Sequence, residues 1–128
     1  MTDSRPLRVL FVCTQNKLRS PTAEALFSQR PGWQVASAGT ERDAPNPLTR
    51  DLVEWADVAV CMQKAHRDWI RSRLKGAIPD DRLLILGIPD DYEFMDPELV
   101  ALLTRLVPAR LEHTVARATE HPGPFRQL

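Results

Sequence analysis

Short apolar runs alternate with longer stretches of helical period along this chain. The apolar runs predict strands at 9–13, 33–38, 57–62 and 82–86, and the stretches between and after them predict helices at 20–30, 49–55, 63–75 and from 96 onward. This alternation is typical of βαβ units packed on a parallel sheet. Because the run at 9–13 is apolar at every position, it suits a central strand that is buried on both faces. We therefore predict an α/β fold built on a parallel sheet.

Two helix starts and one interruption are marked by side chains suited to those positions. Ser20 and Pro21 predict a helix with Ser20 as its N-cap, and Asp96 and Pro97 repeat the pattern at the last helix. Pro108 is expected to bend or restart that helix, because it has no backbone N–H to donate. Residues 119–128 are predicted to be a frayed tail, and the chain, 1–128, is expected to form one domain.

The composition restricts the partners that the protein can bind. The chain has 128 residues, of which 43% are hydrophobic, and it carries 17 basic and 17 acidic side chains. This balance gives no broad positive surface for nucleic acid or for an anionic membrane, so any anion site must be local. The apolar runs are too short for a signal peptide or a membrane span, and we expect a cytoplasmic protein.

The cysteines and histidines point to a lone reactive thiol and not to a metal site. The only two cysteines, Cys13 and Cys61, cannot make a disulfide framework, and the three histidines lack the spacing of zinc ligands. Cys61 lies inside an apolar run and is predicted to be a core residue. His66, His113 and His121 are expected on helix surfaces or in the tail, with structural or solvated roles only.

The segment with the strongest chemical signal runs from Cys13 to Pro21, between a predicted strand and a predicted helix. In an open α/β sheet, ligands bind where strands end and helices begin, because unpaired N–H groups and the helix dipole attract anions there. A bent loop adds further N–H donors, which stabilise a thiolate at Cys13 and hold the oxygens of a phosphoryl group. Arg19 follows Cys13 by six positions, and its planar guanidinium can bind two of those oxygens.

These residues resemble the low-molecular-weight protein tyrosine phosphatase family, whose loop is Cys-x5-Arg-Ser-Pro after a short apolar strand. The matching segments follow the family's order: Phe11-Val-Cys13, Asn16, Arg19-Ser-Pro-Thr-Ala-Glu24, Ser37-Ala-Gly-Thr40, Ala56-Asp57 with Cys61-Met62, and Ile88-Pro-Asp90. The resemblance implies a single three-layer domain. Its four-stranded parallel sheet would have the order 2-1-3-4, with helices on both faces.

The resemblance also implies roles for the residues of the loop. Cys13 would be the nucleophile, Arg19 the phosphate clamp, and Ser20 a hydroxyl that hydrogen-bonds the thiolate. The phosphate-binding loop comprises Thr14, Gln15, Asn16, Lys17, Leu18, Arg19 and Ser20, with Asn16 suited to left-handed backbone. Gln15 replaces the usual Gly, Leu18 replaces a second Cys of many members, and Lys17 lines the pocket mouth. The segment 39–57 is shorter than usual.

The family's general acid is an Asp that follows the last strand in an Asp-Pro pair, and three residues compete for this role. Asp96 stands in a literal Asp-Pro pair, but the same pair also suits a helix start. Asp90 lies four residues past Leu86, which matches the family's distance from the strand. We therefore predict Asp90 as the general acid, with Asp91 and then Asp96 as the alternatives.

The function predicted from these features is that of a cysteine-dependent phosphomonoesterase of the protein-tyrosine-phosphatase type. It would act through a cysteinyl phosphate, without a metal or a cofactor, on a phosphorylated protein or a small phosphorylated molecule. Lys17 would favour substrates with additional negative charge. One alternative is a thiol-dependent arsenate reductase on the same fold, which needs two further cysteines; the other is a non-catalytic phosphate-binding regulatory module. We expect a monomer or a weak dimer.

Overall fold

The sheet has four parallel strands in the computed structural model, which describes residues 5–120 and the side chains of residues 5–112. Its strands are β1 (Leu7–Cys13), β2 (Trp33–Gly39), β3 (Val58–Cys61) and β4 (Leu83–Ile85). Their order is β2-β1-β3-β4, with β1 paired to β2 from Leu7 and Trp33 up to Cys13 and Gly39. The predicted strands are therefore confirmed within one or two residues, and so is the order 2-1-3-4.

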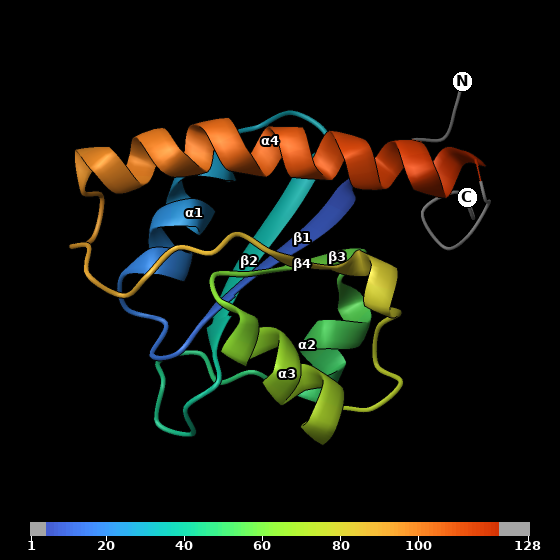
Figure 1. Cartoon of the computed structure of the whole chain (residues 1–128), viewed down its shortest axis with the longest axis horizontal. Helices are drawn as coiled ribbons and strands as arrows, with labels where there is room; N and C mark the ends of the chain where they lie inside the picture. Colours follow the sequence, from blue (N-terminus) through green and yellow to red (C-terminus); the bar gives the residue numbers. More distant parts are fainter. Residues whose placement is uncertain (1–4, 121–128) are drawn as a thin grey trace.

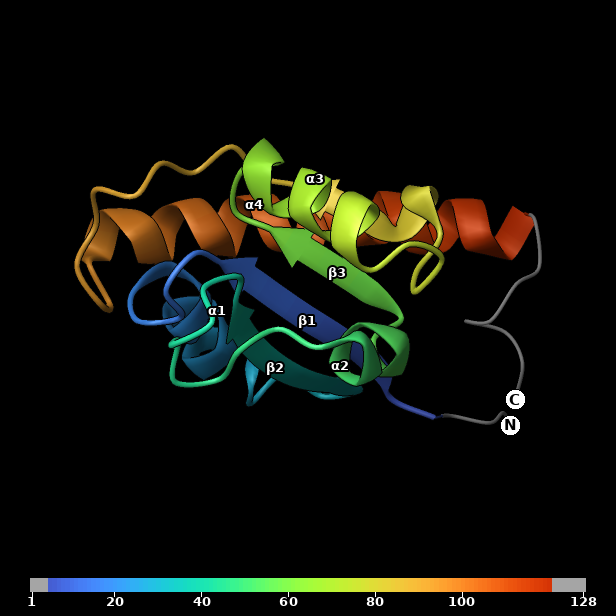
Figure 2. The ribbon, with the colours of Figure 1, turned by 90° about the horizontal axis from the view of Figure 1, so that it is seen from below.

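Helices cover both faces of the sheet, which confirms the three-layer architecture. They are α1 (Arg19–Phe27), α2 (Arg50–Trp55), α3 (Lys64–Arg73) and α4 (Pro97–Glu120), with a 3₁₀ turn at Asp80–Arg82. Helices α1 and α4 pack on one face, and α2 and α3 pack on the other (Figures 1 and 2). No helix within residues 5–120 is long and apolar enough to cross a membrane.

The alternation of side chains along β1 explains why its sequence is apolar throughout. Val9 and Phe11 point into the core cluster that α1 and α4 complete, whereas Leu10 and Val12 point into the cluster beneath α2 and α3. All four side chains are completely buried. Because β1 pairs with β2 on one side and with β3 on the other, it is the centre of the sheet, and its carboxyl end lies at the middle of one sheet edge.

The start of α1 differs from the prediction. The helix begins at Arg19, and Leu18, which has no side-chain cap bond, takes the N-cap position. The prediction that Ser20 is the N-cap was therefore wrong, although Pro21 does lie in the first turn. The Ser20 hydroxyl is fully buried and meets Asn16 and Cys13, so it serves the loop and not the first helical N–H groups.

Helix α4 begins as the sequence predicts but continues without a restart. The Asp96 carboxylate accepts a hydrogen bond of 2.9 Å from the backbone N–H of Glu98, which caps the first turn. The helix then passes through Pro108 up to Glu120. Thr104, four residues before Pro108, is exposed, so water can replace the missing N–H donor. Of the expected tail, residues 119 and 120 belong to α4, and 121–128 lie outside the described residues.

Candidate active site

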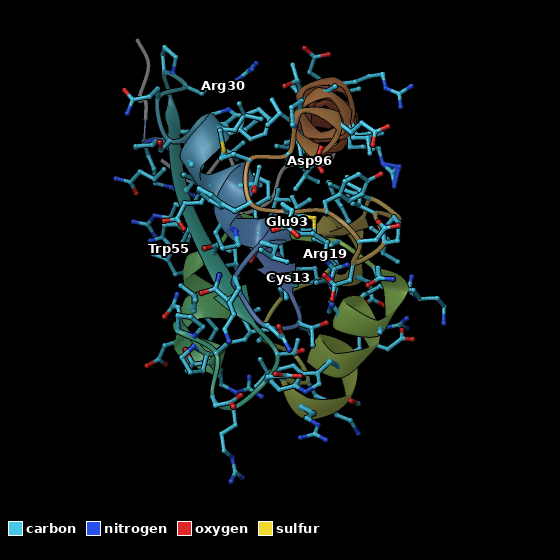
Figure 3. The ribbon with its side chains drawn as sticks, turned by 90° about the vertical axis from the view of Figure 1, so that its left-hand side faces the viewer. Cys13, Arg19, Arg30, Trp55, Glu93 and Asp96 are labelled. Atoms are coloured by element: carbon cyan, nitrogen blue, oxygen red, sulfur yellow. The ribbon has the colours of Figure 1, made fainter. Side chains whose placement is uncertain are left out.

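The loop from Cys13 to Arg19 joins the carboxyl end of the central strand β1 to the first residue of α1 (Figure 3). Cys13 is only 2% exposed, and its Sγ lies 3.0 Å from Oγ of Ser20. The Asn16 Nδ2 group donates to the same Oγ at 3.0 Å. Because the Nδ2 group can only donate, Ser20 accepts from Asn16 and keeps its own proton available for the sulfur. The hydroxyl is therefore oriented to stabilise a thiolate.

Asn16 shapes the loop in the way that the sequence predicts. Its φ of 57° is left-handed, a conformation that Asn tolerates better than most residues. Its amide also donates to Oγ of Ser37 on β2 at 2.9 Å, and Ser37 donates in turn to the Glu24 carboxylate at 2.5 Å. The loop is thus tied by hydrogen bonds to both β2 and α1, so its curvature is fixed before any ligand binds.

The segment that follows β2 presses against the back of this loop. Thr40 and Glu41 donate backbone hydrogen bonds of 3.0 Å to the carbonyl oxygens of Cys13 and Thr14 respectively. A Cβ atom at Gly39 would lie 2.7 Å from the Thr14 carbonyl oxygen and 3.0 Å from the Asn16 nitrogen. Only glycine therefore allows the loop and the end of β2 to approach this closely.

Arg19 is held in a buried site beside the loop. Its side chain is 2% exposed, although it carries a full positive charge. Nη1 donates to Oε1 of Gln63 at 2.6 Å and to the carbonyl oxygen of Ile88 at 2.9 Å, and Nε lies 3.6 Å from the carboxylate of Asp90. The guanidinium is therefore oriented by groups from two separate segments, the start of α3 and the loop after β4, as a preorganised anion site requires.

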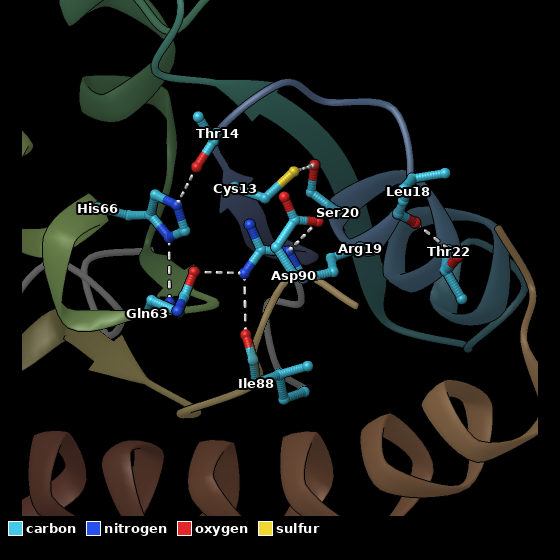
Figure 4. A network of polar contacts seen from close by, with 10 residues as sticks. All are labelled: Cys13, Thr14, Leu18, Arg19, Ser20, Thr22, Gln63, His66, Ile88 and Asp90. Atoms are coloured by element: carbon cyan, nitrogen blue, oxygen red, sulfur yellow. Dashed lines mark hydrogen bonds and ion pairs between the residues drawn. The ribbon is translucent and has the colours of Figure 1, made fainter. Parts of the chain in front are cut away.

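The three candidate aspartates lie in different places. Figure 4 shows Asp90 beside Arg19, on the side where Cys13 and Ser20 lie, and its side chain is 54% exposed. Asp91 is exposed. Asp96 caps α4, at a distance from Cys13 and Arg19 in Figure 3. Of the three, Asp90 is the one that the fold brings to Arg19.

Two residues of this site, Gln63 and His66, were not predicted from the sequence, and His66 was expected on a helix surface or in the tail. His66 is 2% exposed, and its ring bonds both Thr14 Oγ1 and the backbone N–H of Gln63 (Figure 4). Burial and the nearby charge of Arg19 lower the pKa of His66 to about 4, although Asp90 acts in the opposite direction. The signal was available, because the helix after β3 begins at the same sheet edge as the loop after β1. His113 and His121 lie outside the described side chains.

Other site predictions concern the outer face of the loop and the second cysteine. Gln15 and Lys17 are exposed, whereas Leu18 is half-buried. Cys61 is completely buried, as predicted, and burial raises the pKa of its thiol to about 12, so it is inert at neutral pH. No group of three or more potential metal ligands occurs among the residues that the structure describes.

This arrangement is that of an α/β domain with an oxyanion-binding loop, which has a cysteine at one end and an arginine at the other. The model of the family described as low molecular weight phosphotyrosine protein phosphatase matches residues 8–54. The resemblance seen in the sequence is thereby confirmed, and the matched part contains the whole loop.

Named relatives and solved structures show the same similarity. The chain is 31% identical over 96 residues to a protein-arginine-phosphatase of Geobacillus stearothermophilus, covering 56% of this chain and 65% of the relative. For a protein-arginine-phosphatase of Bacillus subtilis the identity is 34% over 93 residues, covering 51% and 61%. The chain thus spans less than two thirds of the length of the curated relatives it matches.

Among solved structures, the YwlE arginine phosphatase from Geobacillus stearothermophilus superposes with a TM-score of 0.64 at 26% identity, over 93% of this chain and 99% of that one. A low molecular weight protein tyrosine phosphatase from T. tengcongensis gives a TM-score of 0.63 at 23% identity, over 80% and 99%, and this match concerns the fold alone.

Proposed function

We propose that this protein is a cysteine-dependent phosphatase that works through a cysteinyl-phosphate intermediate. The observation that carries the proposal is the convergence of a buried thiol, a hydroxyl 3.0 Å from it and a buried guanidinium that lies beside an exposed carboxylate. These groups are the nucleophile, the thiolate stabiliser, the anion clamp and the proton donor that phosphoryl transfer to sulfur needs.

In the first step, the Cys13 thiolate attacks phosphorus, and the bond from phosphorus to the leaving atom breaks. Asp90, in its protonated form, gives its proton to the leaving group, so that no strongly basic anion is released. Arg19 and the loop N–H groups bind the phosphoryl oxygens while charge builds up on them. Because Arg19 is fixed by Gln63 and Ile88, this binding needs little reorganisation.

In the second step, water attacks the cysteinyl phosphate and the sulfur–phosphorus bond breaks. Asp90, now a carboxylate, removes a proton from that water, and inorganic phosphate is formed. The Cys13 thiolate is regenerated as the leaving group, and the Ser20 hydroxyl, 3.0 Å away, stabilises its charge. The same residues therefore act in both steps, without a metal or a cofactor.

The proposal assigns the acid to Asp90, with Asp91 as the neighbouring alternative. Asp90 lies within 3.6 Å of Arg19 and is exposed enough to meet a leaving group and water. Asp96 is a weaker choice because its carboxylate is engaged with the first turn of α4.

We infer that the substrate is a phosphorylated protein, with phosphotyrosine as the first candidate. Phosphoarginine is the second, favoured by the similarity to two relatives named protein-arginine-phosphatase. The exposed Lys17 would attract acidic residues around either phosphorylated side chain. We further propose that the protein acts in the cytoplasm, where thiols stay reduced, as a monomer or a weak dimer.

Neither alternative from the sequence has comparable support. An arsenate reductase would pass electrons through further cysteines, and the only other one, Cys61, is buried with a raised thiol pKa. A non-catalytic phosphate-binding module would not need an exposed carboxylate beside Arg19.

The test is hydrolysis of p-nitrophenyl phosphate by the wild-type protein, by Cys13→Ser and by the matched control Cys61→Ala. We expect turnover in the wild type and the control but none in Cys13→Ser. Absence of turnover in the wild type would refute the proposal. Two peptides that differ only in carrying phosphotyrosine or phosphoarginine then decide the substrate.

A further inference from the structure

A buried histidine connects the helix after β3 with the loop after β1. His66 lies in the first turn of α3, which begins at Lys64, and its ring points toward Thr14 (Figure 4). Nε2 lies 2.9 Å from Oγ1 of Thr14, and Nδ1 lies 3.0 Å from the backbone nitrogen of Gln63. The mechanism above uses Gln63 to hold Arg19 but gives His66 no role.

The partners of His66 fix the position of its proton. A backbone N–H can only donate, so Nδ1, which faces the Gln63 nitrogen, must be the unprotonated acceptor. A neutral ring then carries its hydrogen on Nε2 and donates it to Thr14 Oγ1. If the ring were charged, both nitrogens would be donors, and Nδ1 could no longer accept the hydrogen bond from the Gln63 backbone N–H.

Each of the two hydrogen bonds leads to a different part of the active site. Thr14 directly follows Cys13, and its carbonyl oxygen already accepts from the Glu41 backbone N–H on the other side of the loop. Gln63 presents its side-chain Oε1 to Nη1 of Arg19 at 2.6 Å. The two ring nitrogens of His66 therefore bond Thr14, which is next to the nucleophile Cys13, and Gln63, which orients the guanidinium of Arg19.

We propose that His66 is a positioning residue for the phosphatase reaction, holding Thr14 in the loop and, through Gln63, the guanidinium of Arg19. This inference rests on the proposed function. The hydrogen bonds of its ring go to Thr14 and to the backbone of Gln63, so it acts through the residues it holds. Without the bond to His66, Thr14 keeps its backbone contact with Glu41 but loses the hydrogen bond that ties its side chain to α3.

The experiment is a double-mutant cycle with His66→Gln and Thr14→Val. A Gln at position 66 can still accept from the N-cap backbone N–H, as in a capping box, but cannot extend to Thr14. Thr14→Val removes the hydroxyl at nearly constant volume. We expect each single variant to lower kcat for p-nitrophenyl phosphate by about 3- to 10-fold, the range for one lost hydrogen bond, with little change in KM. The double variant should be no slower than either single one.

The matched control is Lys64→Gln, on the exposed side of the same helical turn, which should keep the wild-type kcat. The fraction of active protein is measured by alkylation of Cys13, so that partial unfolding is not read as a lower kcat. If the two variants multiply their effects, or if folded His66→Gln keeps a kcat within twofold of the wild type, the positioning role is refuted.

Two measurements keep this inference separate from the proposed function. Vanadate affinity is measured for the wild type, His66→Gln, Thr14→Val and the double variant. We expect the double variant to bind vanadate no more weakly than either single variant. If the wild type binds vanadate but hydrolyses no phosphorylated compound, the proposed function fails, and the vanadate cycle still decides the role of His66. The nitrogen chemical shifts of His66 should show the Nε2–H form at pH 7, and Thr14→Val should move them; unchanged shifts would overturn the hydrogen bond itself.

Discussion

The buried imidazole of His66 should make the stability of this protein depend on pH in a way that can be calculated. Its pKa is lowered in the folded protein from 6.5 to about 4, first by burial and then by the charge of Arg19, against which Asp90 acts. Between these two values the unfolded chain binds more protons than the folded one. The free energy of unfolding must therefore fall as the pH drops from about 6.5 to about 4.

The size of the loss follows from the two pKa values. Linkage gives a decrease of about 3 kcal/mol between pH 7 and pH 4 from His66 alone. His66→Gln has no titrating group at this position. It should be less stable than the wild type at pH 7 by about 1 kcal/mol, for the lost bond to Thr14. The two curves of stability against pH should consequently cross at a pH of about 5.5–6.

The assay is urea unfolding of both proteins at several pH values from 7 to 4. Carboxylates that titrate in this range are common to the two proteins, so they cancel in the difference between their free energies of unfolding. A parallel pair of curves, with no crossing, would refute the reasoning. It would mean that folding does not lower the pKa of His66.

The remaining predictions concern the loop and its partners. Arg19→Lys should lower kcat by about 10²-fold or more although the charge is kept, because one ammonium cannot replace a planar guanidinium; activity within a few-fold of the wild type would contradict the clamp. Asp90→Asn should slow phosphates with poor leaving groups by about 10²–10⁴-fold and spare activated aryl phosphates, and Asp96→Asn should not; the reverse pattern would move the acid to the start of α4. Gly39→Ala should cost about 1–3 kcal/mol in urea unfolding and reduce activity, since its Cβ would lie 2.7 Å from the Thr14 carbonyl oxygen; unchanged stability would mean that the loop shifts freely.

Features encoded in neighbouring residues could be predicted from the sequence. The continuous apolar run of β1 identified a central strand because both faces of that strand are covered. The spacing from Cys13 to Arg19, between a strand and a helix, identified the loop, since both residues belong to one short segment. The left-handed backbone expected at Asn16 is likewise a local preference of that residue type, and its φ is 57°.

The N-cap assignment of Ser20 shows where a local rule gave the wrong answer. A serine before a helical segment is normally read as a cap, because its oxygen can accept from the first turn. Here the hydroxyl has Asn16 and Cys13 as partners within the loop, and the N-cap lies two residues earlier, at Leu18, without a side-chain cap bond. The competing partners belong to the curved loop, whose shape the linear pattern does not contain.

Only the tertiary structure decided which distant residues complete the site. Sequence distance left Asp90, Asp91 and Asp96 in competition, and the path of the chain after β4 brings Asp90 to Arg19. Because β3 lies next to β1, the start of α3 reaches the loop and places His66 against Thr14, 52 positions apart in sequence. Propensity and periodicity describe neighbours along the chain, whereas burial and hydrogen bonding at a sheet edge depend on the strand order.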